Sequence, residues 1–223
     1  MKKQKKRSLC IALGLLAAFV LWTAAIRLID VRPIGPQEST VGFAALNRYV
    51  HGLTGVHMSL YTVTDWLGLV PFGVAFGFAL LGLVQWSKRK RIGKVDQSIL
   101  VLGGFYLVVM AVYVFFELCV VNYRPVLIDG NLEASYPSST TMLVLTVMPT
   151  AAMQWNARIK KPALRRGVVS VTIVFVALMI VGRLFSGVHW ITDIMGGALL
   201  SAGLVMLYVS LVDNGAAESI YSN

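Results

Sequence analysis

The sequence predicts an all-α, polytopic membrane protein with six transmembrane helices and a short amphipathic outer helix between the first and second. Of its 223 residues, 57% are hydrophobic and only 13% are charged, which is unlike a soluble globular domain. Apolar runs of about the 20 residues that cross a bilayer recur along the chain. Because these runs are closely spaced, we expect a single membrane domain over residues 1–223.

The six expected spans share a length near the thickness of a bilayer, and they are Leu9–Ile29, Thr64–Trp86, Ser98–Val121, Ser138–Trp155, Val168–Phe185 and Trp190–Val212. The first follows a basic start that resembles a signal peptide, but no clear small-residue cleavage site follows it, so we expect it to stay as a span. Val41–Leu53 has apolar residues at helical spacing and predicts the amphipathic helix. Arg183–Asp193 must form the tight turn between the last two spans.

The basic residues predict the orientation. Of the 20 Lys and Arg residues, five lie in Met1–Arg7, five in Lys88–Lys94 and five in Arg158–Arg166. In a six-span protein these segments share one side, which the positive-inside rule places in the cytoplasm together with both termini and a short polar tail, residues 213–223. We therefore expect these basic residues to interact with the lipid bilayer. Nucleic-acid binding fits poorly, since no aromatic residues are interleaved with the basic ones.

The polar residues of the last turn carry the clearest functional signal. Arg183, His189 and Asp193 are ionisable residues at the edge of apolar sequence, where such residues are costly and are usually functional. His189 and Asp193 are four apart, so on a helix they share a face and the carboxylate can orient the imidazole. Arg183 offers a planar fork suited to phosphate. The alternative interpretation is a purely structural polar network.

Two further segments are expected on the same outer side. Glu117 and Arg124 are seven residues apart, which is two helical turns, so on a helix they share a face. Either they form a buried ion pair, or Arg124 faces the same outer pocket as Arg183. At the start of the fourth span, Ser138, Ser139 and Thr140 follow Pro137. Hydroxyl residues here are typical of a helix N-cap, and the same N-terminus is also an anion site.

These residues resemble a known family. Arg124-Pro125, then Pro137-Ser138, then Arg183 with His189 and Asp193 are similar in order and spacing to the three-part signature of the type-2 phosphatidic acid phosphatases. That superfamily also includes bacterial acid phosphatases and vanadium haloperoxidases, and the chain resembles its integral-membrane lipid phosphatase branch. The resemblance covers about residues 117–197.

The resemblance implies an enzyme that needs neither a metal nor another cofactor. His189 would attack phosphorus to form a phosphohistidine, and Asp193 would orient it. The phosphoryl oxygens would be held by the remaining signature residues, namely Arg124, Arg183 and the backbone around Ser138 and Ser139.

Two positions depart from the family pattern. Glu117 stands where the first motif has a lysine, and Thr140 stands where the second motif has the histidine that protonates the leaving group. General acid catalysis is typically worth about 10²–10⁴-fold, so a substrate with a good leaving group, such as a lipid diphosphate, suffers least. The sequence leaves four candidates for a replacement acid: His51, His57, Asp129 and Glu133.

The predicted function is that of a lipid phosphatase in the cytoplasmic membrane, acting on a lipid phosphate or diphosphate at the outer face. The altered Glu117 and Thr140 leave two alternatives: an impaired member that binds phosphorylated lipid, and an enzyme that transfers the phosphoryl group to another acceptor. A transporter fits poorly, because the spans are nearly free of charge except near their outer ends.

Overall fold

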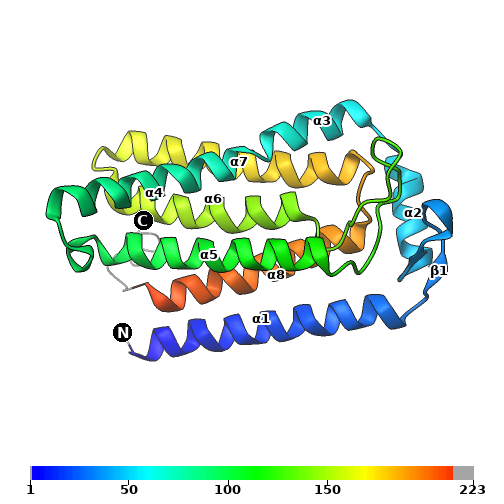
Figure 1. Ribbon diagram of the computed structural model, residues 1–223, viewed down its shortest axis with the longest axis horizontal. Coiled ribbons are helices and arrows are strands. Elements are labelled where there is room, and N and C mark those ends of the chain that lie inside the picture. Colours follow the sequence, from blue (N-terminus) through cyan, green and yellow to red (C-terminus); the bar gives the residue numbers. More distant parts are fainter. Residues whose placement is uncertain (1, 213–223) are drawn as a thin grey trace.

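The computed structural model describes residues 2–212 and shows long helices lying side by side (Figure 1). The helices are α1 (Lys2–Leu28), α2 (Ala44–Thr54), α3 (Met58–Leu67), α4 (Val70–Arg89), α5 (Gln97–Leu118), α6 (Ser139–Arg158), α7 (Pro162–Phe185) and α8 (Ile191–Leu211). Two strands of two residues, β1 (Arg32–Pro33) and β2 (Thr40–Val41), pair antiparallel before α2. The all-α membrane class is confirmed. The tail expected at residues 213–223 lies outside the described residues.

Five helical segments of the described chain are long and apolar enough to cross a membrane, and they are Lys3–Leu28, Met58–Arg89, Gln97–Leu118, Pro162–Phe185 and Ile191–Leu211. The fourth predicted span, Ser138–Trp155, corresponds to α6, which has 20 residues but is not in this set. The helix packs against α4, α5, α7 and α8, so its surface faces protein and not lipid. Buried polar residues such as Thr146, Thr150 and Gln154 lower its hydropathy. A count of six spans therefore stays a prediction.

The second span differs from its predicted bounds, Thr64–Trp86. The helical segment starts six residues earlier, at Met58, and is interrupted at Gly68 and Leu69, where α3 ends and α4 begins. Pro71 lies in the first turn of α4, where its missing N–H leaves no helical bond unmade. The helix α2 occupies the place predicted for the amphipathic outer helix and starts at Ala44.

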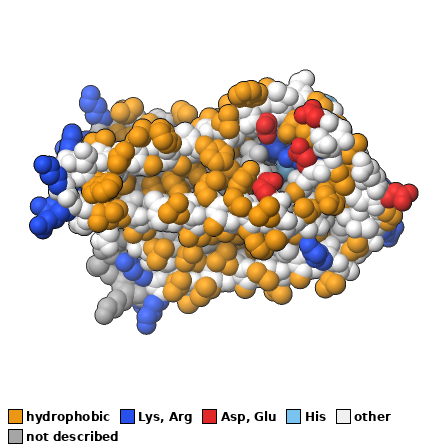
Figure 2. Space-filling view, in the orientation of Figure 1, with side chains coloured by type: hydrophobic (Ala, Val, Ile, Leu, Met, Phe, Trp, Pro, Cys, Tyr) orange, Lys and Arg blue, Asp and Glu red, His pale blue; other side chains and the backbone are white. Residues whose placement is uncertain are grey.

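The two ends of the bundle differ in charge. The α4–α5 and α6–α7 connections, which contain the basic segments Lys88–Lys94 and Arg158–Arg166, lie at one end. At the other end, α2, the α5–α6 loop and the α7–α8 turn lie together (Figure 1). Figure 2 shows Lys and Arg gathered at the first end, and acidic side chains around a hollow near the second. The residues that the sequence predicts for the outer side thus lie together at the end of the bundle opposite two of the basic clusters.

Candidate active site

The α7–α8 turn, residues 186–190, sets the position of His189. Gly187 in this turn has a φ of +68°, a conformation that residues with a side chain rarely adopt, and it passes directly against the backbone of Gly55. His57 N–H also donates to the carbonyl of Ser186 at 2.9 Å, which ties the turn to the start of α3. His189 is consequently held rigidly, with only 3% of its surface exposed.

The expected contact between His189 and Asp193 is indirect. His189 precedes α8, so the two residues do not share a helix face, and the prediction of a direct pair was wrong. The hydroxyl of Ser135 lies between them: its Oγ is 3.0 Å from His189 Nδ1 and donates to Asp193 Oδ2 at 2.5 Å. The same carboxylate accepts from Trp190 N–H at 3.0 Å and from Asn122 Nδ2 at 3.2 Å.

The other ring nitrogen of His189 fixes the tautomer. Arg183 Nη2 lies 2.9 Å from His189 Nε2, and a guanidinium can only donate, so Nε2 carries the lone pair and Nδ1 the proton. Burial, with the charges of Arg183 and Arg124, holds the pKa of His189 well below its ordinary value. His189 is therefore a neutral imidazole at neutral pH, with the lone pair that a nucleophile requires.

Two arginines from distant parts of the chain meet over one aromatic ring. The guanidinium carbons of Arg183, in the last turn of α7, and Arg124, in the α5–α6 loop, lie 5.2 and 5.7 Å from the ring centroid of Tyr61. Arg183 is 1% exposed and Arg124 is 9% exposed. Nε and Nη1 of Arg124 and Nε of Arg183 make no hydrogen bond with the described residues. Buried N–H groups without partners, next to one another, are suited to an oxyanion.

The ion pairs of these arginines differ from the predicted one. The helix α5 ends at Leu118, so Arg124 does not follow Glu117 on a helix face, and that expectation was wrong. Arg124 instead pairs with Glu133, with 3.2 Å between Nε and Oε2, although the N–H is not aligned for a hydrogen bond. Arg183 Nη1 lies 3.7 Å from Asp65 Oδ1.

A cavity of about 740 Å³ opens beside this cluster. Its polar lining comes from α3, α5, the α5–α6 loop and α6, and consists of Asp65, Tyr113, Glu117, Tyr123, Arg124, Glu133, Ser139 and Thr140. In Figure 2 acidic side chains surround the hollow, and basic and histidine side chains are visible inside it. His189 and Arg183 lie just behind the lining, because Arg183 contacts Asp65 and His189 contacts Arg183.

The serines at the start of α6 differ in what they can bind. Ser138 is the N-cap, its hydroxyl accepts from Thr141 N–H at 3.5 Å, and its own N–H donates to the carbonyl of Asp193 at 3.0 Å. Both polar groups of Ser138 are thus used inside the protein, which favours the capping interpretation over phosphate binding. Ser139 and Thr140 line the cavity and remain open to a ligand.

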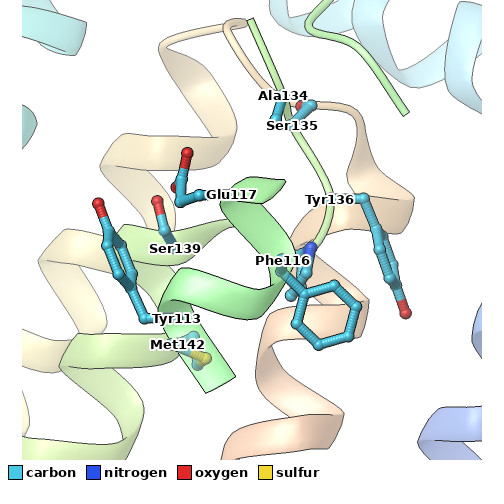
Figure 3. A pocket seen from close by; sticks show the side chains of 9 residues that line it. Tyr113, Phe116, Glu117, Ala134, Ser135, Tyr136, Ser139 and Met142 are labelled. Carbon is cyan, nitrogen blue, oxygen red and sulfur yellow. The ribbon is translucent and has the colours of Figure 1, made fainter. Parts of the chain in front are cut away.

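A second, much smaller cavity shares lining residues with the large one, and Figure 3 shows the side chains that line it. Its volume of about 10 Å³ is close to the minimum for one water molecule. Glu117, Ser135 and Ser139 all line it, and Glu117 and Ser139 also line the large cavity. Glu117 therefore lies between the open cavity and Ser135, the serine that contacts His189.

Of the four candidate replacement acids, only Glu133 lines the large cavity. His51 Nε2 lies 3.1 Å from the carbonyl of Gly187, and His57 Nε2 lies 3.0 Å from that of Thr54, so both rings have backbone partners away from the cavity lining. Asp129 is on the α5–α6 loop and is not part of the lining. Since Glu133 pairs with Arg124, none of the four is a free acid facing the cavity.

Four residues of the site were not predicted from the sequence: Tyr61, Asp65, Asn122 and Ser135. Asp65 carries a usable signal, because it is the lone acidic residue of a long apolar run, as Glu117 is of the next. The other three belong to no motif, and only the fold brings them to the site. Among residues 2–212, no group of three or more His, Cys, Asp or Glu side chains is placed to hold a metal ion.

The model of the PAP2 superfamily matches residues 105–216, half of the chain. The chain belongs to the PAP2 superfamily. The match includes Arg124, Arg183, His189 and Asp193, so the resemblance read from the sequence is confirmed at the level of the family.

Two other comparisons accompany this PAP2 assignment. A solved structure described as the first transmembrane PAP2 type phosphatidylglycerolphosphate phosphatase from Bacillus subtilis is similar, with a TM-score of 0.49 and 20% sequence identity over 89% of this chain and 94% of that one. The comparison with curated proteins finds no match.

Proposed function

We propose that this PAP2 protein is an integral-membrane phosphatase that hydrolyses a lipid phosphate or diphosphate through a phosphohistidine on His189. The observation that carries the proposal is the neutral, buried imidazole of His189, whose Nε2 contacts the guanidinium of Arg183. The guanidiniums of Arg183 and Arg124 lie over the same Tyr61 ring, and both have N–H groups without a hydrogen-bond partner among the described residues. Together they supply a nucleophile and the positive charge that phosphoryl transfer requires. The expected site at the outer membrane face is part of the proposal.

In the first step, the non-bridging oxygens of the phosphate bind Arg124 and Arg183, and Arg183 gives up its bond to His189 Nε2. The freed lone pair attacks phosphorus, so that the N–P bond forms as the bond to the leaving oxygen breaks. The imidazole ring becomes cationic, and Asp193 stabilises this charge through Ser135, which accepts the Nδ1 proton's hydrogen bond. In the second step, water attacks the phosphohistidine, which releases phosphate and restores neutral His189.

The effect of Thr140 on the rate depends on the leaving group, because the family has a histidine there that protonates it. Thr140 has no acidity near neutral pH, so an alkoxide would leave without a proton from this position. A lipid diphosphate expels a phosphate ester, which is a far better leaving group. We therefore expect diphosphates to be turned over faster than monophosphates with the same lipid chain.

Hydrolysis is preferred over the alternative of an impaired, lipid-binding member because the nucleophile retains its complete surroundings. A protein that only binds phosphorylated lipid needs the two arginines, but it has no need for the Ser135 and Asp193 contacts that orient His189. Transfer to another acceptor shares the first step, and product analysis with and without added acceptor lipid separates it from hydrolysis.

The test is phosphate release by the purified protein in detergent from matched lipid monophosphates and diphosphates. Release should vanish in His189→Ala, and Thr140→His should raise the monophosphate rate more than the diphosphate rate. Arg32→Ala is the control variant and should leave release unchanged, because Arg32 is exposed and pairs with Asp30, and neither residue lines the cavity. Release that persists unchanged in His189→Ala would contradict the proposal.

A further inference from the structure

The large cavity has more acidic than basic side chains, although its proposed ligand is a phosphate. Three carboxylates line it, those of Asp65, Glu117 and Glu133, and they come from α3, α5 and the α5–α6 loop. The side chains of Asp65 and Glu133 are 57% and 42% exposed, and Glu117 is also exposed. Two arginines, Arg124 and Arg183, oppose these three carboxylates. The walls of the site thus have a net negative charge before any substrate enters.

Phosphate binding makes this imbalance worse. Arg183 is the partner of Asp65, and Arg124 is the partner of Glu133, so a phosphate that takes the arginines competes with both carboxylates. Glu117 has no basic partner among the described residues, and it stands where the family has a lysine. A substrate with negative charge alone would leave three carboxylates facing its phosphate across one cavity.

An anion nevertheless belongs in this cavity. Arg124 is nine-tenths buried and lines it, and two of its guanidinium nitrogens have no hydrogen-bond partner among the described residues. The acidic walls and this unsatisfied guanidinium are independent observations, and both are accounted for by a ligand that has both signs of charge.

We infer that the substrate carries an organic ammonium group a few bonds from its phosphate. Asp65, Glu117 and Glu133 bind the ammonium while Arg124 and Arg183 bind the phosphate. This inference rests on the proposed function for the position of the phosphate, and it adds the chemical class of the lipid: an amino lipid phosphate.

The rest of the lining suits an ammonium better than a metal ion. Tyr113, Tyr123 and Phe72 line the same cavity, and aromatic rings attract organic cations through their faces. The three carboxylates are not placed together as a metal site within residues 2–212. Carboxylates spread around an aromatic wall fit a group that is larger and less demanding in geometry than Mg²⁺ or Ca²⁺.

The test compares two lipids that differ by one charge. A long-chain 2-aminoalkyl phosphate and its N-acetyl derivative have the same chain and phosphate, and only the first has an ammonium group. With the full-length protein in detergent and EDTA present, we expect kcat/KM for the amine to exceed that for the N-acetyl lipid by about fivefold, the scale of one partly exposed ion pair. Glu117→Gln should remove most of this preference, because it deletes a partner of the ammonium and also one carboxylate that faces the phosphate of the N-acetyl lipid.

Glu38→Gln is the matched control, because Glu38 is exposed, lies before α2 and is not part of the cavity lining. It makes the same change in net charge and should leave the preference intact. If both lipids are hydrolysed equally well, the inference is overturned and the proposed function stands. If added Mg²⁺ or Ca²⁺ raises the hydrolysis rate of the N-acetyl lipid to that of the amine, the carboxylates bind an inorganic cation, and the inference is again overturned.

A failure of the proposed function gives a different result. If neither lipid releases phosphate, the inference is tested by binding. Microscale thermophoresis measures the affinity of each lipid for the wild type and for Glu117→Gln. Tighter binding of the amine that is lost in Glu117→Gln supports the inference without catalysis. Equal binding of the two lipids overturns it.

Discussion

The hydroxyl of Ser135 links His189, the proposed nucleophile, to the carboxylate of Asp193. Oγ accepts a hydrogen bond from His189 Nδ1–H and donates one to Asp193, so the negative charge of Asp193 acts on the imidazole through one intervening group. Asn122 and the N–H of Trp190 fix the other directions of the carboxylate. The orientation of the nucleophile therefore depends on a loop residue as much as on the carboxylate.

Ser135→Ala should lower kcat by roughly tenfold to a hundredfold, since hydrogen bonds to charged groups are worth about 1.5–3 kcal/mol. KM should change little, because Ser135 does not line the large cavity. Steady-state kinetics on the best lipid substrate measures the two constants separately. Ser135→Thr, which keeps the hydroxyl, should recover part of the lost kcat, and an unchanged kcat in Ser135→Ala would remove the serine from the mechanism.

The lowered pKa of His189 predicts how stability depends on pH. Burial, the largest cause, depresses this pKa in the folded protein, so below the ordinary value of 6.5 the unfolded chain binds a proton that the folded chain does not. The contribution of neutral His189 is fully present above pH 6.5 and is lost as the pH falls toward the depressed pKa.

We expect the Tm of the wild type to fall more steeply between pH 7 and pH 5 than that of His189→Gln, which cannot titrate at this position. Thermal unfolding in one detergent across this range measures the difference. Parallel curves for the two proteins would mean that the His189 pKa is close to its ordinary value.

At the scale of helices, α3 brings residues to the site that lie far from the signature motifs in sequence. Tyr61, Thr64 and Asp65 come from this helix, and they contact Arg124 and Arg183. The contact with α7 is close because position 182 has no side chain: a Cβ there would lie 2.6 Å from Thr64 Cγ2. The glycine at position 182 thus makes room for α3.

Gly182→Ala should destabilise the protein by about 1–3 kcal/mol, the usual cost of overpacking, and should lower activity by moving Asp65 and Tyr61. The double variant Gly182→Ala/Thr64→Ser should recover much of both losses, since it deletes the methyl that clashes and keeps the hydroxyl. Thermal unfolding and phosphate release are the measurements. A single variant that behaves as the wild type would mean that the α3–α7 contact has no part in holding the site.

The sequence predicts the helices well and the contacts between them less well. Apolar length gives the spans, and the spacing around Arg183 and His189 gives the family, because both signals lie in continuous sequence. The role of Ser135 and the pairing of Arg124 with Glu133 depend on how the α5–α6 loop folds back on itself. Residues four apart share a face only where both are helical. His189 lies one residue before the N-cap of α8, so the predicted direct contact with Asp193 does not form.

At the scale of the whole molecule, the separation of charge predicts its orientation. Two of the basic clusters lie at the end opposite the cavity, and basic residues next to spans stay in the cytoplasm. The proposed site is then outside, where it meets lipids of the outer leaflet.

Single cysteines test this orientation in a Cys10→Ser/Cys119→Ser background, in which both natural cysteines, which are exposed, are removed. In intact cells, a membrane-impermeant maleimide should label Asp129→Cys at the cavity end. Lys90→Cys, at the basic end, should be labelled only after the cells are permeabilised. The reverse pattern would place the site in the cytoplasm.

The central helix α6 has a consequence for how the protein is made. Its buried hydroxyls and amide find partners on other helices: Thr146 donates to Ser201, and Gln154 to the hydroxyl of Tyr208, both on α8. On leaving the ribosome, α6 precedes α8, so the translocon receives a segment in which Thr146 and Gln154 still lack these partners on α8. Such a segment partitions poorly into lipid on its own, and its stable insertion awaits the synthesis of the last helix. A chain truncated before α8 should therefore lose the membrane integration of α6 while earlier, more apolar helices remain inserted.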